Sequence, residues 1–130
     1  MIKIVTQLAI FMDNRPGMLA RTCQALAKAH INILALSIVD TVDHAVVRVV
    51  VDKTEEAKQV LASIHAMVQG RDVVFMDVQN QAGAMARIAE QLAEAGINIE
   101  YAYCTASPSQ AAGALVVRTN DLEATINALS

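Results

Sequence analysis

A stretch of 24 residues near the start of the chain recurs 66 residues later, and this repeat limits the fold more than any other feature. Residues 13–36 align without gaps on residues 79–102, and ten of the 24 aligned positions are identical. Unrelated segments do not share so many positions. The repeat distance of 66 residues is about half of the 130-residue chain, so two copies of that length fill it. We therefore expect the chain to fold as two tandem copies of one small unit.

Both copies show the same succession of hydrophobic patterns. Alternating apolar residues predict a strand, a turn and an amphipathic helix follow, and two further apolar strands precede a last helix. In the first copy the two later strands are expected at Ile31–Val39 and Ala45–Val51. Asp52 is expected to start the last helix, with Glu55 in a capping box, and Asn120 is expected to cap its counterpart. In the second copy, Gly96 is expected to end the first helix in the left-handed conformation.

A fourth strand would complete each copy as a ferredoxin-like βαββαβ unit. In the first copy it must lie near Met67–Gly70, almost directly before the first strand of the second copy. The second copy ends at Ser130 without such a strand. Because the repeat shift places Met67–Asp72 opposite Met1–Thr6, we hypothesise that Ile2–Val5 closes the sheet of the second copy, from the same chain or from a partner chain.

The expected fold belongs to the α+β class. Residues 1–70 form one unit and residues 71–130 the other, and their strands join one antiparallel sheet with helices on one face. Hydrophobic residues make up 55% of the chain and aromatic residues only 3%. Strands as apolar as Ala45–Val51 need cover on both faces of a sheet. We therefore expect burial between units and between chains, and at least a homodimer.

Charge and composition argue against several classes of protein. The net charge is −3 and there is no basic run, which disfavours nucleic-acid binding. No apolar stretch is long enough to span a membrane. The first residues do not resemble a signal peptide, and Cys23 and Cys104 fit no metal or redox spacing, so a cytoplasmic chain with free thiols is expected. His30, His44 and His65 lack metal-ligand spacing. No catalytic set recurs, so we expect no metal, no cofactor and no enzymatic activity.

The residues best suited to chemistry lie in the turn before the first helix of each copy. Asn14-Arg15-Pro16-Gly17-Met18-Leu19 is echoed by Asn80-Gln81-Ala82-Gly83-Ala84-Met85. Free N–H groups at a helix start attract a carboxylate, a glycine lets a ligand approach the backbone, and an asparagine serves both ammonium and carboxylate groups. These properties suit a free α-amino acid, although an ordinary turn has the same composition. At the helix exits, Asn32 and Asn98 either cap a turn or point toward the loop of another unit.

The chain resembles the ACT domain family in both copies. The resemblance rests on a strand, the run Asn14–Ala20, an amphipathic helix and the exit His30–Ile33, and it covers nearly the whole chain. ACT domains pair side by side and bind amino acids at the interface between them. The resemblance thus implies a non-catalytic, amino-acid-binding regulatory module that acts on a separate enzyme of amino-acid metabolism. By match to the family pattern, the ligand-binding residues are Asn14, Gly17, Met18 and Leu19 with Asn98 opposite, and Asn80, Gly83, Ala84 and Met85 with Asn32 opposite.

Departures from the family pattern leave alternatives open. The second loop lacks the proline and the arginine of the first, which suggests a degenerate site. Met12 and Val78 stand where some serine-binding relatives carry histidine, which argues against a serine site. The chain also resembles stand-alone tandem ACT proteins and, more loosely, the small regulatory subunits of acetolactate synthase. A regulatory subunit without its own ligand is therefore one alternative, and a small acylphosphatase-like enzyme that uses Arg15 is another.

Overall fold

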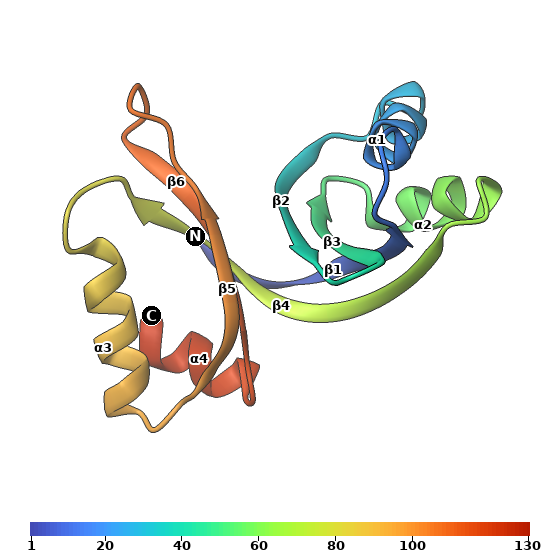
Figure 1. Ribbon diagram of the computed structural model, residues 1–130. Helices are drawn as coiled ribbons and strands as arrows, with labels where there is room; N and C mark the ends of the chain where they lie inside the picture. The colour runs from blue at the N-terminus through green and yellow to red at the C-terminus, as the bar shows by residue number, and fades with distance from the viewer. The chain divides into compact units, whose positions relative to one another are not determined.

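A computed structural model describes residues 1–130, which divide into two compact units (Figure 1). We call Thr6–Arg71 the N-terminal unit, and Met1–Val5 together with Asp72–Ser130 the C-terminal unit. None of the four helices has the length and apolar character of a membrane span. The elements are β1 (Ile2–Asp13), α1 (Met18–Lys28), β2 (Ile33–Asp40), β3 (His44–Val51), α2 (Thr54–Ser63), β4 (Met67–Gln79), α3 (Ala84–Glu94), β5 (Ile99–Thr105), β6 (Ala112–Thr119) and α4 (Leu122–Leu129).

The strand order gives each unit the ferredoxin-like arrangement. Hydrogen-bonded neighbours follow the order β2-β3-β1-β4 in the N-terminal unit and β5-β6-β4-β1 in the C-terminal unit. β1 pairs antiparallel with β3, and β4 pairs antiparallel with β6. The strands expected at Met67–Gly70 and after it are one continuous strand, β4. Beside it, the backbone oxygen of Met1 accepts a hydrogen bond from the amide of Asp77 at 3.1 Å.

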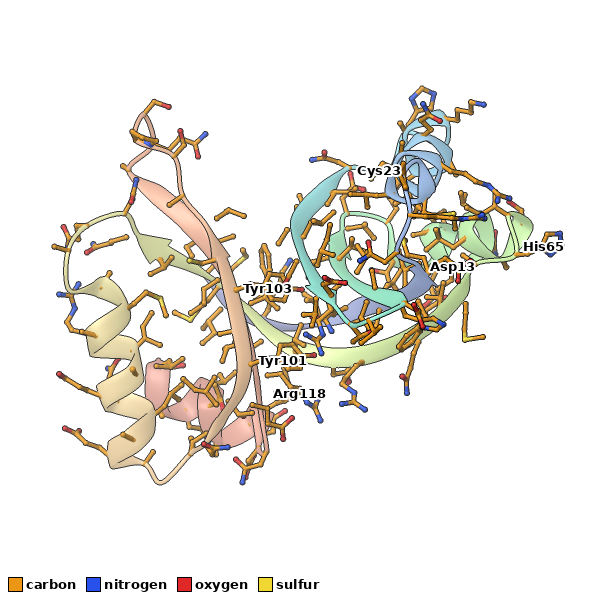
Figure 2. All side chains as sticks on the ribbon, in the orientation of Figure 1. Asp13, Cys23, His65, Tyr101, Tyr103 and Arg118 are labelled. Carbon is orange, nitrogen blue, oxygen red and sulfur yellow. The ribbon has the colours of Figure 1, made fainter.

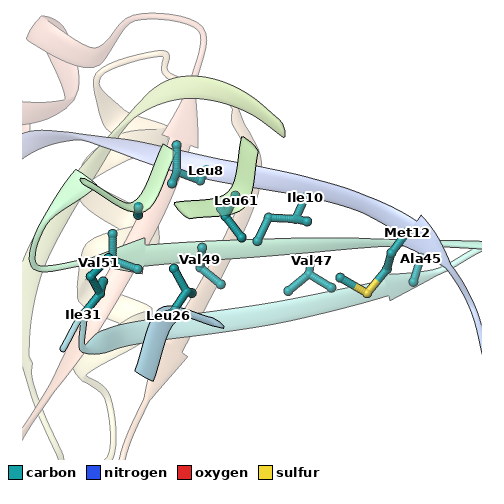
Figure 3. Close-up of a cluster of buried hydrophobic side chains, with 11 residues drawn as sticks. Leu8, Ile10, Met12, Leu26, Ile31, Ala45, Val47, Val49, Val51 and Leu61 are labelled. Carbon is teal, nitrogen blue, oxygen red and sulfur yellow. The ribbon is translucent and has the colours of Figure 1, made fainter. Parts of the chain in front are cut away.

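The core of the N-terminal unit lies between the sheet and its two helices (Figure 3). Successive side chains of a strand point to opposite faces, so every second residue of β1 and β3 reaches the helices. Leu26 of α1 and Leu61 of α2, with 1% and 0% of their surface exposed, close the core from the other side. Each such burial contributes about 1.5–3 kcal/mol. The cluster consists of Leu8, Ile10, Met12, Leu26, Ile31, Ala45, Val47, Val49, Val51, Ala57 and Leu61.

The C-terminal unit repeats this packing with fewer fully buried residues. Ile88 and Leu92 of α3 pack against Leu115 of β6. A buried polar contact joins β6 to α4, where the hydroxyl groups of Thr119 and Thr125 are 2.7 Å apart and both residues are 0% exposed. Because a buried hydroxyl without a partner is costly, this pair fixes how α4 sits on its sheet.

The start of α2 differs from the prediction. The helix begins at Thr54, and Lys53 at its N-cap makes no side-chain capping hydrogen bond, so Asp52 and Glu55 form no capping box. The Oδ1 atom of Asp52 instead accepts a hydrogen bond from the amide of Asn32 at 2.9 Å. A long-range contact with the start of the neighbouring strand has therefore replaced the local cap.

The ends of α3 and α4 show one correct and one incorrect prediction. Gly96 follows α3 with a φ of 71°, the left-handed stop that the sequence predicts. The cap of α4 is Asp121 rather than Asn120, because the Oδ1 atom of Asp121 accepts from the amide of Ala124 at 3.0 Å. The prediction was wrong by one residue, since both residue types cap helices equally well.

Candidate functional site

The two strand-to-helix loops have the same backbone. Gly17 and Gly83 occupy the N-cap positions of α1 and α3 with φ values of 88° and 89°. Residues other than glycine rarely adopt this left-handed conformation. The repeated glycine of the sequence therefore has a direct structural reason, because each loop must turn sharply to start its helix.

Both helix starts present backbone donors. The amide of Met18 donates to the carbonyl of Arg15 at 3.4 Å, and that of Arg21 donates to Gly17 at 3.0 Å. Neither helix has a side-chain cap at its N-terminus. The amides of Leu19 and Ala20, which lie between those two, have no acceptor within their helix. The same holds for the corresponding amides of α3, so each loop offers N–H groups and a positive helix end to an anion.

The asparagine of each loop holds the neighbouring hairpin. The Nδ2 atom of Asn14 donates to a carboxylate oxygen of Asp40, at the end of β2. The Nδ2 atom of Asn80 donates to the carbonyl oxygens of Ser107 and Gln110 at 2.8 and 2.9 Å, between β5 and β6. The amide groups of both side chains are thus engaged within their own units, and their carbonyl oxygens remain as acceptors.

Each loop borders a hollow, and the two hollows differ in size. The hollow at the first loop, which includes Asn14, Met18 and Leu19, has a volume of about 60 Å³. The hollow at the second loop has a volume of about 270 Å³. The second is lined by Val78, Gln79, Asn80, Gln81, Gly83, Ala84, Met85, Ala86, Cys104, Thr105, Ala106 and Gly113. The structure thus brings together Asn80, Gly83, Ala84 and Met85 around one cavity.

The exit asparagines lie away from the loop of their own unit. Asn14 precedes α1 and Asn32 follows it, and a helix of 11 residues is about 16 Å long. Asn98 has the same place after α3, and both residues are exposed. The backbone amide and carbonyl of Asn32 both pair with Asp52. Within one unit, the loop and the exit asparagine therefore lie at opposite ends of the helix. The pairing of each exit asparagine with the loop of the other copy stays a prediction.

A further cleft was missed by the sequence reasoning. It lies in the N-terminal unit and has a volume of about 490 Å³, larger than either loop hollow. Its lining residues are Ile10, Phe11, Met12, Asp13, Met18, Arg21, Thr22, His44, Ile64, His65, Ala66 and Met67. His44 and His65 are 21 positions apart in the sequence, which is no metal-ligand spacing. The pairing of β1 with β3 sets Asp13 opposite His44 and so brings distant polar residues to one place.

The described residues show no metal centre. Nowhere do three or more His, Cys, Asp or Glu side chains gather closely enough to hold an ion. Cys23 is half-buried and Cys104 is exposed, and both are free thiols.

Comparisons with known proteins agree with this architecture. A family model described as an ACT domain pair matches residues 3–129. A crystal structure of a Bacteroides thetaiotaomicron protein superposes with a TM-score of 0.90 at 31% identity, over 98% of this chain and 88% of that chain. The ligand-free regulatory subunit of Thermus thermophilus aspartate kinase superposes with a TM-score of 0.72 over 98% of this chain and 93% of that chain, but at 19% identity it shows the fold alone.

The family model shows which family the chain belongs to. No curated protein sequence matches the chain significantly. The model nevertheless extends over nearly all of both units. Its match confirms the resemblance inferred from the repeated loops and helix exits. The chain therefore belongs to the ACT family, as a pair of ACT domains.

Proposed function

We propose that the chain is a non-catalytic regulatory module that binds a free amino acid and acts on a separate enzyme of amino-acid metabolism. The observation that carries this proposal is the repeated helix start. In both units a left-handed glycine leads into a helix without a side-chain cap. The carboxylate of an amino acid suits those free N–H groups and the positive end of the helix.

The proposed ligand needs a second wall at the first loop. A hollow of about 60 Å³ is much smaller than an ordinary small-molecule site, which has a volume of about 300–1,000 Å³. We propose that a second copy of the chain supplies the missing wall, and with it Asn32 and Asn98. The proposed contact residues are Asn14, Gly17, Met18, Leu19, Asn32, Asn80, Gly83, Ala84, Met85 and Asn98.

The outer strand β2 supports a homodimer. β2 has only one hydrogen-bonded neighbour, β3, and thus forms an edge of the sheet. Leu34, Leu36 and Ile38 are exposed by 40%, 36% and 47% along this edge. An open apolar edge strand is a template for pairing with another chain. Ile38 also lines the first-loop hollow, so pairing at β2 would cover that hollow.

The nature of the regulated enzyme is proposed from the structural relatives. The regulatory subunits of aspartate kinase from Thermus thermophilus and Thermus flavus share the fold. By analogy, this chain acts in trans on a catalytic subunit, and an enzyme that phosphorylates a small amino acid is the first candidate. A regulatory subunit without a ligand of its own would have the same fold but no response to amino acids.

A thermal-shift screen of the twenty amino acids tests the proposal. A ligand at a hundred times its dissociation constant stabilises the protein by about 2.7 kcal/mol, which raises Tm by several degrees. Asn14→Ala or Asn80→Ala should remove this response, because each releases a loop from its hairpin. The exposed Asn127→Ala on α4 is the matched control.

Two results would count against amino-acid sensing. If no amino acid moves Tm at saturating concentration, the proposed ligand class is wrong. If the chain also captures a partner enzyme whose activity is insensitive to amino acids, a purely structural subunit replaces the proposal. A response that Asn127→Ala reduces as much as Asn14→Ala would argue against the loop as its site.

A further inference from the structure

The large cleft of the N-terminal unit combines an apolar floor with a polar rim. Buried Ile10 and half-buried Met18 and Ile64 form part of its apolar lining. Two exposed apolar side chains complete it, with Phe11 exposed by 37% and Met67 by 70%. A volume of about 490 Å³ falls in the ordinary range of small-molecule sites, about 300–1,000 Å³.

The rim carries one arginine and two histidines, whose ring N–H groups can donate hydrogen bonds. Arg21 is held at the cleft because its guanidinium donates to the backbone oxygen of Ile64 at 3.3 Å. His44 and His65 also line the cleft, and Asp13 is its only acidic residue. Figure 2 labels Asp13 at the end of β1 and His65 just after α2. An arginine fixed in this way favours a carboxylate, which it can bind through paired hydrogen bonds.

His65 adopts a backbone conformation that disfavours its side chain. It follows α2 with a φ of 60°, where glycine is the usual residue and where Gly96 stands after α3. His30 has the same conformation after α1, with a φ of 58°. His30 lies outside the cleft, whereas His65 lines it. A strained residue at a cavity is an observation from which a function can be inferred.

The internal repeat provides a reference for the cleft. The positions of Asp13 and Thr22 correspond to Gln79 and Ile88 in the second copy, and Ala112 stands opposite Gln79 as His44 stands opposite Asp13. Only Arg21 has an identical counterpart, Arg87. The polar rim therefore distinguishes the N-terminal unit from the C-terminal unit, while the apolar face of each helix is shared.

We infer that this cleft binds a small aliphatic monocarboxylate, with its carboxylate on Arg21, His44 and His65 and its carbon chain on the apolar floor. An ammonium group on the same molecule would pair with Asp13. This contact would distinguish an amino acid from a simple carboxylic acid, which has no ammonium group. The inference goes beyond the proposed function, because this cleft stands inside one unit and does not use the free amides of the loops. Met12 and Met18 line both the cleft and the first-loop hollow, so an occupied cleft bears on that loop as well.

Methyl NMR of the whole chain tests the site, because isoleucine and methionine methyl groups line it. The probes are leucine, isocaproate and isoamylamine, which share one carbon body and differ in carboxylate and ammonium. At about 10 mM, ten times the Kd of a millimolar site, leucine or isocaproate should shift Ile10, Ile64 and Met67. Isoamylamine should shift them much less, because it lacks the carboxylate that Arg21 binds. Met76, which packs against the core of the C-terminal unit and lines neither the cleft nor the second-loop hollow, serves as the internal control.

Matched variants separate the site from general effects. Arg21→Gln should weaken binding about tenfold or more, whereas Arg87→Gln, its repeat counterpart, should not. His65→Gly and His30→Gly both relieve a left-handed backbone, but only His65→Gly should weaken binding. Asp13→Asn should weaken the binding of leucine but not of isocaproate if Asp13 pairs with the ammonium group, and of neither probe if the cleft recognises the carboxylate alone.

Three outcomes would overturn the inference. They are the absence of any methyl shift at about 10 mM, equal shifts with isoamylamine, and an Arg87→Gln effect as large as that of Arg21→Gln. Asn14→Ala keeps the two proposals distinguishable. It should remove the thermal response that belongs to the loops and leave the cleft shifts with isocaproate intact, so either proposal can fail without the other.

Discussion

At the residue scale, five positions share a positive φ and serve different ends. Gly17 and Gly83 turn a strand into a helix, and Gly96 ends α3. His30 and His65 end α1 and α2 in the same left-handed conformation. A glycine at such a position costs no steric strain, whereas a histidine there is tolerated at a cost. The two histidines are therefore the positions at which this left-handed backbone carries a steric cost.

Two glycine substitutions should differ because their surroundings differ. A Cβ at Gly17 would meet nothing within 4 Å, so Gly17→Ala costs only backbone strain, about 1–2 kcal/mol. A Cβ at Gly113 would lie 1.8 Å from the carbonyl oxygen of Thr105. Gly113→Ala should therefore destabilise the protein more, since the backbone must move. Urea unfolding measures both, and a neutral Gly113→Ala would contradict the packing of the β5–β6 hairpin.

At the element scale, each loop is tied to the hairpin beside it. Asn80 spans from its loop to both sides of the β5–β6 turn, and Asn14 reaches the end of β2. These hydrogen bonds lie within each unit, and the repeated asparagine makes them in both units. A change in either loop is therefore felt by the hairpin, which is the physical basis on which a ligand at the loop could alter a strand edge.

Loss of the Asn80 tie should loosen its hairpin. Asn80→Ala removes two hydrogen bonds, and each contributes about 0.5–1.5 kcal/mol. We expect a loss of about 1–2 kcal/mol in unfolding free energy and faster amide exchange across residues 106–111. Asn127→Ala, on an exposed helix face, should change neither quantity. Equal exchange in both variants would show that the tie adds nothing.

The first five residues should stabilise the C-terminal unit. They lie beside β4, where the amide of Asp77 bonds to Met1 and the N-terminal ammonium group is 3.3 Å from its carboxylate. Deleting Met1–Val5 should raise amide exchange in residues 72–79 and leave the core of the N-terminal unit protected. In the full chain, half-buried Ile4→Ala should act in the same direction and exposed Lys3→Ala should not. Unchanged exchange after the deletion would refute this role.

Periodicity and repetition predicted the elements well, but side-chain partners depended on tertiary contacts. The order of strands and helices and the left-handed stop at Gly96 follow from local patterns. The carboxylate of Asp52 accepts a hydrogen bond from the backbone amide of Asn32, just before β2, so the predicted capping box does not form. The cleft was missed for the same reason: His44 and His65 meet there only because β3 and α2 fold onto β1. Spacing in sequence carries no signal for such a meeting.

At the scale of the whole molecule, regulation requires that ligand binding favour one arrangement of the chain over another. A second copy at the β2 edge would link ligand binding to assembly. Ile38 lines the first-loop hollow and is also exposed at that edge, so one residue would take part in both. The high apolar content of the chain then serves assembly as well as the two cores. Ligand affinity and dimer stability should rise together.

A charge at the edge strand should separate the copies. Ile38→Glu places a carboxylate on an exposed apolar edge and should shift sedimentation at micromolar concentration from dimer to monomer. Because Ile38 is already 47% exposed, unfolding of a monomer should change by less than about 1 kcal/mol. Val42→Glu, at a position 96% exposed in the β2–β3 turn, is the control. A wild-type monomer at this concentration would contradict the assembly.

The most direct test of the account is an amide NMR titration of the whole chain with the amino acid that the thermal screen selects. The account predicts saturable shifts centred on the amides of Leu19 and Ala20, or of Met85 and Ala86, because these donors lack an acceptor in their helix. Saturation should follow the same dissociation constant as the thermal response. Shifts confined to other parts of the chain, or no saturable shift with any amino acid, would contradict the claim that these loops make the protein an amino-acid sensor.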